Sequence, residues 1–281
     1  RDRREEANLI ALSLREALEK PDQTAAMVTP DRQLAELVIA DLRRWDIVIE
    51  DSAGKRLSLC PPGRFISLLC DAVDANFAPL RLLSLLKHPY CAGGMNPIQF
   101  RHFVDQIELA VFRGPRPGDG LHAIAAALDD AELRHFFETH VIANLAALID
   151  CWQTPNPTLA SLSDGVAEAA ERLCATVMDS NGAGADRGAG AIELWKNADG
   201  MAASDLFRSL ATDGRDSAID AGDMPQILRQ LLEDINVHPF GTPHPRLAIL
   251  GAVEARMHLA RAVDAHRFIL AGFNEGNWPP R

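Results

Sequence analysis

Cysteine pairs, long apolar runs and recognisable catalytic motifs are all missing from this sequence, and each absence excludes a class of protein. The five cysteines form no C-x-x-C pair; they are Cys60, Cys70, Cys91, Cys151 and Cys174. This odd number and wide spacing argue against a disulfide framework or a zinc site, and they favour a reducing, cytoplasmic location. No apolar run reaches the roughly 18 residues of a membrane span, so we expect no membrane contact.

No complete active site is visible in the sequence. Gly54-Lys55 lacks the upstream glycine and the following serine or threonine of a phosphate-binding loop, because Ile49 and Arg56 occupy those positions. The glycines from 182 to 190 follow no strand signal and precede no Lys-Ser/Thr pair. No G-x-S-x-G or H-x-x-x-H motif occurs, and no histidine has a cysteine or carboxylate suitably arranged for nucleophilic catalysis. We therefore assign no catalytic residue and no metal ligand.

The net charge of −11 is concentrated in the middle of the chain. Residues 1–116 hold 16 Lys/Arg and 16 Asp/Glu, residues 117–244 hold 7 and 20, and residues 245–281 hold 5 and 3, which gives 0, −13 and +2. A phosphate backbone is repelled by the middle block and tolerated by the flanks. The middle is therefore a poor DNA-binding surface, and it is either a solvated helical face or a dock for a basic partner.

The N-terminal part alternates between helix and strand signals. A helix is predicted over residues 5–20 and a short buried strand over Thr24–Val28. Thr29 and Pro30 fit an N-cap followed by proline at the first helical position. The apolar stripe of this second helix comprises Leu34, Val38, Leu42 and Trp45. The β-branched run Ile47–Ile49 predicts a second inner strand, and such alternation is typical of a parallel α/β sheet.

From about residue 61 to residue 236 the periodicity is helical and strand signals vanish. The predicted helices include Arg64–Ala75, Leu80–Lys87, Ile98–Phe112, Leu121–Leu128, Ala131–Ile149 and Leu159–Met178. Cys70 and Cys174 fall in apolar patterns of these helices, and we expect both to be buried. The glycine-rich residues 179–190 are predicted to form a flexible linker.

Two short apolar runs near the C-terminus are each followed at once by glycine and polar residues. The first begins at Leu247 and leads into Gly-Ala-Val-Glu-Ala-Arg at 251–256. The second begins at Phe268 and leads into Gly-Phe-Asn-Glu-Gly-Asn-Trp-Pro at 272–279. Each run suits a buried parallel strand, and ligands of open α/β sheets lie where such strands end. A binding site is therefore expected at these two loops.

These two motifs, together with Thr-Pro-Asp-Arg at 29–32, resemble the AddB subunit of bacterial AddAB helicase-nucleases, a family that is similar to the UvrD-like helicases. The resemblance implies an α/β fold with a partial RecA-like parallel sheet, the second helicase domain of the UvrD-like kind, interrupted by a long all-helical insertion. The expected domains are 1–60, the first part of the RecA-like domain, 61–243, the helical insertion, and 244–281, the truncated return to the sheet.

The resemblance also implies an activity. AddB-type subunits take part in ATP-dependent unwinding and resection of DNA ends at double-strand breaks, before recombinational repair, together with an AddA-type helicase-nuclease subunit. ATP and Mg would act in the parent complex, and neither would be bound wholly by this segment. The nuclease domain and any iron–sulfur cluster would lie outside this chain, which we take to be an internal piece of a longer protein because it lacks an initiator methionine.

Glu254 is the nucleotide-binding candidate that the resemblance implies. UvrD-like helicases have Lys-Gly-Leu-Glu in this region; here the glutamate is present and the lysine is missing. Glu254 is expected to hydrogen-bond a nucleotide ribose or to hold the neighbouring loop, and Arg256 to contact phosphate. Alternatively, an ion pair of Arg256 with Glu254 or Asp264 merely fixes the loop.

Three further residues are candidate DNA or phosphate contacts. Arg32 is expected at a helix N-terminus, where backbone N–H groups favour phosphate, unless it forms a surface salt bridge with Asp31 or Glu36. Asn274 is predicted to lie in a tight turn that supports the path of a DNA strand. Trp278 is available to stack a base, or else it packs against the core.

The missing lysine favours a helicase fold that has changed from a motor to a DNA-scanning scaffold. Two alternatives remain open. The first is an ATP-driven motor domain of a UvrD-like helicase, with ATP held between this domain and one upstream. The second is a helical protein-interaction scaffold in which residues 117–244 dock a basic partner.

Overall fold

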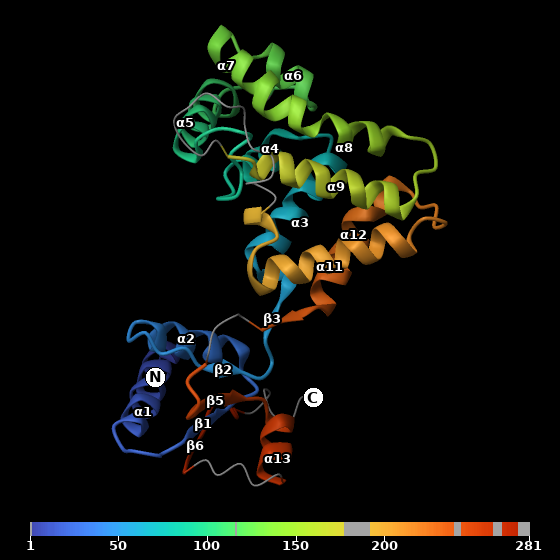
Figure 1. Ribbon diagram of the computed structural model, residues 1–281. Helices are drawn as coiled ribbons and strands as arrows, with labels where there is room; N and C mark the ends of the chain where they lie inside the picture. The colour runs from blue at the N-terminus through green and yellow to red at the C-terminus, as the bar shows by residue number, and fades with distance from the viewer. Residues whose placement is uncertain (1, 116, 177–191, 239–242, 261–265, 275–281) are drawn as a thin grey trace. The chain divides into compact units, whose positions relative to one another are not determined.

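The computed structural model describes residues 2–115, 117–176, 192–238, 243–260 and 266–274. They form a mostly helical α/β protein with two compact units (Figure 1). One unit joins the two ends of the chain, Arg1–Gly54 and His238–Arg281, and the other comprises Lys55–Val237. We call them the sheet unit and the helical unit. The predicted linker at 179–190 lies outside the described residues.

The sheet unit contains a four-stranded parallel sheet with the strand order β2-β5-β1-β6. Its strands are β1 (Ala25–Val28), β2 (Glu50–Asp51), β5 (Leu247–Leu250) and β6 (Arg267–Leu270). In the central strand, Ala25 aligns with Leu247 on one side and with Arg267 on the other. The α/β class and the parallel sheet are confirmed, and both C-terminal apolar runs form strands where the sequence predicts them.

Helices cover both faces of this sheet. α1 (Arg3–Leu18) and α2 (Arg32–Arg43) pack on one face, in a buried cluster with Met27 of β1. α13 (Ala252–Ala260) lies on the opposite face, where Ala255 packs against the apolar side chains of β1 and β5 that point that way. Because successive side chains of a strand point to opposite faces, the two clusters share strands but no residues.

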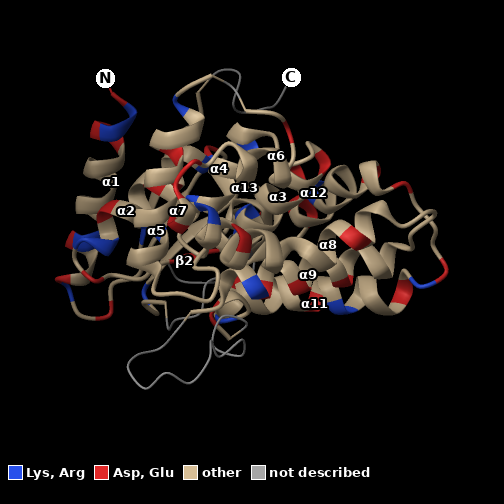
Figure 2. Cartoon of the chain, turned by 90° about the horizontal axis from the view of Figure 1, so that it is seen from above, with Lys and Arg blue, Asp and Glu red and all other residues tan. Residues whose placement is uncertain are grey.

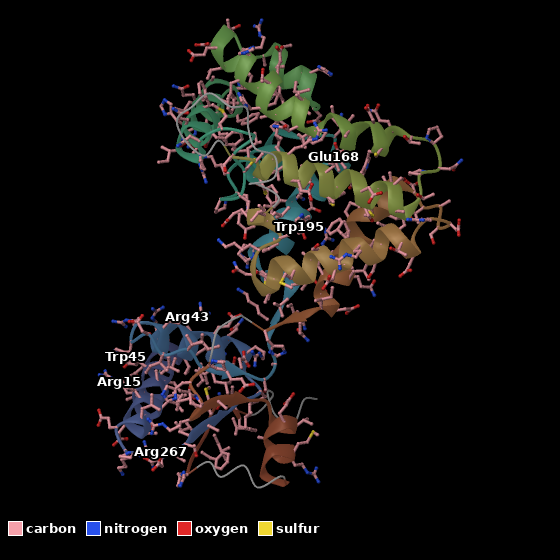
Figure 3. All side chains as sticks on the ribbon, in the orientation of Figure 1. Arg15, Arg43, Trp45, Glu168, Trp195 and Arg267 are labelled. Atoms are coloured by element: carbon pink, nitrogen blue, oxygen red, sulfur yellow. The ribbon has the colours of Figure 1, made fainter. Side chains whose placement is uncertain are left out.

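Two arginines fasten α1 within the sheet unit (Figure 3). The guanidinium of Arg15 lies 4.9 Å from the centroid of the Trp45 ring. Arg267, the first residue of β6, donates to the carbonyl oxygen of Ser13 at 3.0 Å and pairs with Glu16 at 2.7 Å. The hydrogen bond from Arg267 holds the pKa of the Glu16 carboxyl below its usual value. The edge strand is thereby tied to the first helix.

The predicted strand at Ile47–Ile49 is wrong, because the chain is still leaving a turn there. α2 ends at Arg43, so Trp45 lies in this turn and not on the helix, and Asp46 has a positive φ of 55°. Pairing with β5 begins only at Glu50. The β-branched run therefore serves as an extended connection into a strand made of two acidic residues.

Asp31, and not the predicted Thr29, caps α2. The N–H of Thr29 donates to the carbonyl oxygen of Leu250 at 3.0 Å, which extends the pairing of β1 with β5 by one residue. Asp31 accepts the N–H of Leu34 at 3.1 Å, and the hydroxyl of Thr29 accepts the N–H of Asp31 at 3.0 Å. Pro30 therefore precedes the cap and does not open the helix.

β6 is an edge strand within the described part of the chain, and this differs from the buried strand that its apolar run predicts. Its residues alternate between half-buried and exposed, and the side chains of Phe268 and Leu270 are 37% and 71% exposed. A continuous apolar run forms a strand that is buried on both faces only where other elements cover both faces of the sheet, and the described elements leave Phe268 and Leu270 of β6 uncovered.

The helical unit occupies the chain between β2 and β5. Its main helices are α3 (Pro61–Asp74), α4 (Pro79–Leu86), α5 (Pro97–Ile107), α6 (Leu121–Ala126), α7 (Ala131–Phe136), α8 (Ala143–Gln153), α9 (Leu159–Cys174), α11 (Asn197–Asp213) and α12 (Met224–Asp234). A short antiparallel pair, β3 (Lys55–Arg56) and β4 (Asn236–Val237), joins the two ends of the unit. The helical periodicity of this region is confirmed in its described residues.

π-helical turns interrupt two of the predicted helices. Glu108–Phe112 continues α5 in this form, and Phe137–Ile142 separates α7 from α8. Cys70 and Cys174 are buried in the core, as predicted, and burial raises the pKa of both thiols. Among the described residues, no helix is both long and apolar enough to cross a membrane, and no group of three or more His, Cys, Asp or Glu side chains is arranged to hold a metal ion.

Candidate functional site

A topological switch point lies between the two central strands, β1 and β5. The connection from β1 through α2 leads to β2, on the far side of β5, whereas the connection from β5 through α13 leads to β6, on the far side of β1. The two connections therefore diverge from neighbouring strands and cover opposite faces. Ligands of open α/β sheets bind in the crevice that such a divergence leaves outside the carboxyl ends of the strands. This edge is the candidate site.

The turn after β1 forms one wall of the site. Thr29 is almost fully buried, and its hydroxyl and the Asp31 carboxylate hold the first turn of α2. Gly272, just after β6, lies against this turn with a φ of +69°. A Cβ atom at this position would come within 2.9 Å of both Asp31 Cβ and Thr29 Oγ1, so glycine is needed for the close approach and for the backbone conformation.

The Arg32 side chain forms a two-pronged ion pair with Asp51. Arg32 Nη1 donates to Asp51 Oδ1 at 3.1 Å, and Nη2 contacts the other carboxylate oxygen. The Asp51 side chain is 12% exposed, and its Oδ1 also accepts the N–H of Ala53 at 3.2 Å. Arg32 therefore forms a salt bridge, as the alternative expected, but its partner is Asp51 and not Asp31 or Glu36. Paired in this way, Arg32 contributes little free positive charge to the site.

Glu254 lies in the first turn of α13, at the carboxyl end of β5. Its carboxylate folds back over Gly251, so closely that a Cβ atom at that position would collide with the Glu254 oxygen. The N–H of Gly251 donates to the hydroxyl of Ser52 at 3.4 Å. Ser52 is the first residue after β2, the strand that pairs with β5. Acidic side chains are favoured in the first turn of a helix because the N–H groups there carry partial positive charge.

The proposed ion pair between Glu254 and Arg256 is not formed in the described part of the chain. Glu254 is half-buried and Arg256 is exposed, and the structure places no hydrogen bond or ion pair between them. Asp264, the other partner considered for Arg256, lies outside the described residues. The carboxylate of Glu254 is thus left available to accept hydrogen bonds at the edge of the sheet.

The remaining predicted residues are placed only in part. Asn274 is exposed two residues after Gly272, at the same edge as Arg32 and Glu254. Trp278 lies outside the described residues. The carboxyl ends of β1, β5 and β6 therefore bring Arg32, Glu254 and Asn274 to one edge of the sheet, while Arg256 lies within α13.

Asp51 lies at this edge but is not among the predicted site residues; the sequence indicates only a turn at Asp51–Gly54. Its position immediately before Ser-Ala-Gly, at the end of a strand, was the available signal, and it was lost because that strand was predicted too early. A carboxylate at the end of a parallel strand beside a helix that starts with arginine is well placed for such a pair.

The fold and this edge define an open parallel α/β sheet with a topological switch point and a long helical unit inserted in its chain. No family model matches the sequence, and no curated protein matches it.

Proposed function

We propose that this chain is a helicase-like segment of an AddB-type subunit of a DNA helicase-nuclease. In this account its sheet unit is part of the second RecA-like domain, and it acts in the unwinding and resection of DNA ends at double-strand breaks beside an AddA-type subunit. The observation that carries the proposal is the insertion of residues 55–237 between β2 and β5, which are neighbouring strands of one parallel sheet. That arrangement fits the resemblance of the motifs at 29–32, 251–256 and 272–279.

We further propose that the segment serves as a DNA-scanning scaffold and not as a motor. A nucleoside triphosphate is bound by cations and by backbone N–H donors around its phosphates. At the carboxyl edge of the sheet, Arg32 is neutralised by Asp51, Asp31 pairs with Arg3 at 3.2 Å, and Glu254 adds negative charge. The sequence also holds no phosphate-binding loop. ATP and Mg are therefore assigned to the parent complex, chiefly to its partner subunit.

The motor alternative has one observation in its favour: the carboxylate of Glu254 at the switch point has no ion-pair partner among the residues that the structure describes. A carboxylate in that position is suited to accept the two hydroxyl groups of a ribose. If the motor account holds, the full-length chain alone binds ATP and loses that binding on Glu254→Ala. If the scaffold account holds, neither form binds ATP.

The experiment that tests the proposed function compares DNA-end processing with and without this chain. The AddA-type subunit is assayed alone and with the full-length chain on a blunt duplex, and both the affinity for the end and the rate of resection are measured. We expect the chain to raise affinity for the end and to be required for resection. An AddA-type subunit that neither binds the chain nor gains resection from it contradicts the proposal.

A further inference from the structure

A pocket of about 580 Å³ lies within the helical unit, between the start of α4 and the π-helical turn Glu108–Phe112. Figure 1 shows α4 and α5 in this unit, and the π-helical turn continues α5. The volume falls in the range of about 300–1,000 Å³ that is usual for sites of small molecules. It is large enough for one base with its sugar and phosphate.

One wall of the pocket is apolar. Phe112, Leu80 and Leu83 line it, and Leu80 is 76% exposed although it is a large hydrophobic residue. The exposed Leu80 and the half-buried Phe112 together give this wall apolar surface that a ligand can cover. Apolar and aromatic surfaces of this kind hold the faces of nucleobases with little regard for sequence.

Arginines lie at the rim of the same pocket. Arg113 reaches Glu108 Oε1 with its Nε at 3.2 Å and its Nη2 at 2.9 Å, and its side chain stays 67% exposed. Glu108 is also held by Lys87, so its charge remains balanced if Arg113 turns to another anion. The hydrogen bonds from Lys87 and Arg113 lower the pKa of Glu108, which keeps it ionised.

Arg81, the second arginine of the rim, is also only loosely held. It lies 3.8 Å from Asp71, whose carboxylate has a shorter contact of 3.0 Å with Arg229. An arginine that shares its carboxylate with a better-placed arginine keeps much of its charge available. The planar fork of a guanidinium matches a phosphate group well.

The charge of the helical unit is unevenly distributed: residues 55–78 hold three Lys/Arg and two Asp/Glu, net +1, and the pocket lies in the more basic stretch that follows. Residues 79–117 hold five Lys/Arg and two Asp/Glu, net +3, whereas residues 118–237 hold 7 and 20, net −13. Acidic residues recur along α9 and α11 (Figure 2). A polyanion is therefore attracted to the pocket and repelled by the rest of the unit.

We propose that this pocket binds one nucleotide of a single-stranded DNA. The base packs on Phe112 and Leu80, and the adjoining phosphate pairs with Arg113 and Arg81. The assignment to DNA and not to another polyanion rests on the proposed function. It gives the helical unit a role in holding a separated strand, which is distinct from any role of the sheet edge.

The test measures the affinity of the full-length chain for a fluorescein-labelled oligothymidine by anisotropy, over a series of salt concentrations. The pocket variants are Arg113→Gln and Leu80→Ser, both at exposed positions where the fold tolerates change. The matched control is Arg208→Gln in α11, because Arg208 is 70% exposed and pairs only with the nearby Asp205 among the described residues.

We expect each pocket variant to weaken binding about tenfold, a loss of about 1.4 kcal/mol, since each removes one contact of the nucleotide with the pocket. Arg113→Gln also lowers the slope of log K against log salt by about 0.7, the value for one lost phosphate contact on a single strand. Leu80→Ser leaves the slope unchanged, because it removes no charge. The control variant binds as the wild type does.

Pocket variants that bind like the control overturn the pocket assignment, whatever the affinity of the wild type. If the wild type still binds duplex ends, that result leaves the proposed function intact. If the wild type binds neither oligothymidine nor duplex ends at low salt, both proposals fail. Photocrosslinking of an oligonucleotide that contains 5-iodouracil adds a direct readout: the adduct is expected on a peptide that contains Phe112, and an adduct confined to other peptides contradicts the pocket.

Discussion

The guanidinium of Arg32, at the start of α2, and the carboxylate of Asp51, at the end of β2, form a two-pronged ion pair across the carboxyl edge of the sheet. This ion pair links the start of α2, the helix that connects β1 to β2, to the end of β2 itself. It also removes from the site the one arginine that its helix N-terminus would have offered to a phosphate.

Arg32→Ala is expected to destabilise the sheet unit by about 1–2 kcal/mol, because the mostly buried Asp51 carboxylate loses its partner. Arg43→Ala is the matched control, since Arg43 is exposed on the same helix (Figure 3) and has no ion-pair partner among the described residues. Urea unfolding of both variants and the wild type measures the difference. Equal stability of the two variants would show that the pair is not formed in solution.

Gly272→Ala is expected to destabilise the protein by about 1–3 kcal/mol, since alanine is strained at a φ of +69° and its Cβ meets Thr29 and Asp31. The control is Gly114→Ala, where no atom lies within 4 Å of the added Cβ and no positive φ is required. Thermal unfolding followed by circular dichroism compares the two. A Gly272→Ala protein as stable as the Gly114→Ala protein contradicts the close approach of β6 to the β1–α2 turn.

His88 makes the stability of the helical unit depend on pH. Burial, with Arg64 and Arg101 nearby, lowers the pKa of His88 to about 4. The ring lies 5.0 Å from that of Phe65, and its Nδ1 accepts the N–H of Tyr90 at 3.3 Å. The folded state thus holds His88 neutral, while the unfolded chain protonates it near its ordinary pKa of 6.5.

The stability that His88 contributes is therefore complete above pH 6.5 and is lost as the pH falls toward about 4. The slope stays below about 1.4 kcal/mol per pH unit, the value for one full proton, because only one group takes up a proton. We expect His88→Phe to flatten the free energy of unfolding across this window, and the exposed His102→Phe to leave it unchanged. Urea unfolding at several pH values measures both, and parallel profiles for the two variants would contradict the shift.

The apolar strands β1 and β5 are predictable from the sequence, whereas the acidic strand β2 is not. β1 and β5 are buried from end to end or nearly so, and their runs stand out in the sequence. β2 consists of Glu50 and Asp51, which carry no strand signal of their own and pair only because β5 lies beside them. The cap of α2 was misplaced for a similar reason, since Thr29 continues the pairing of the sheet.

The location of the site is predictable from the sequence, but the ion-pair partner of Arg32 is not. The rule that ligands lie where parallel strands end directed attention to Glu254 and Arg32, and the structure brings the ends of their strands to one edge. The partner of Arg32 depends on the order of the strands, which places β2 beyond β5 and beside the start of α2. Strand order is a property of the whole sheet, and local pattern does not contain it.

The most direct test of the scaffold account is the rate of ATP-driven unwinding of a blunt duplex by the complex of the full-length chain with its AddA-type partner. Wild type and Glu254→Ala are compared while the ATP site of the partner is intact. The account predicts equal rates, because the sheet edge around Glu254 drives no ATP hydrolysis. Loss of unwinding in the Glu254→Ala complex would contradict it and identify this chain as a motor.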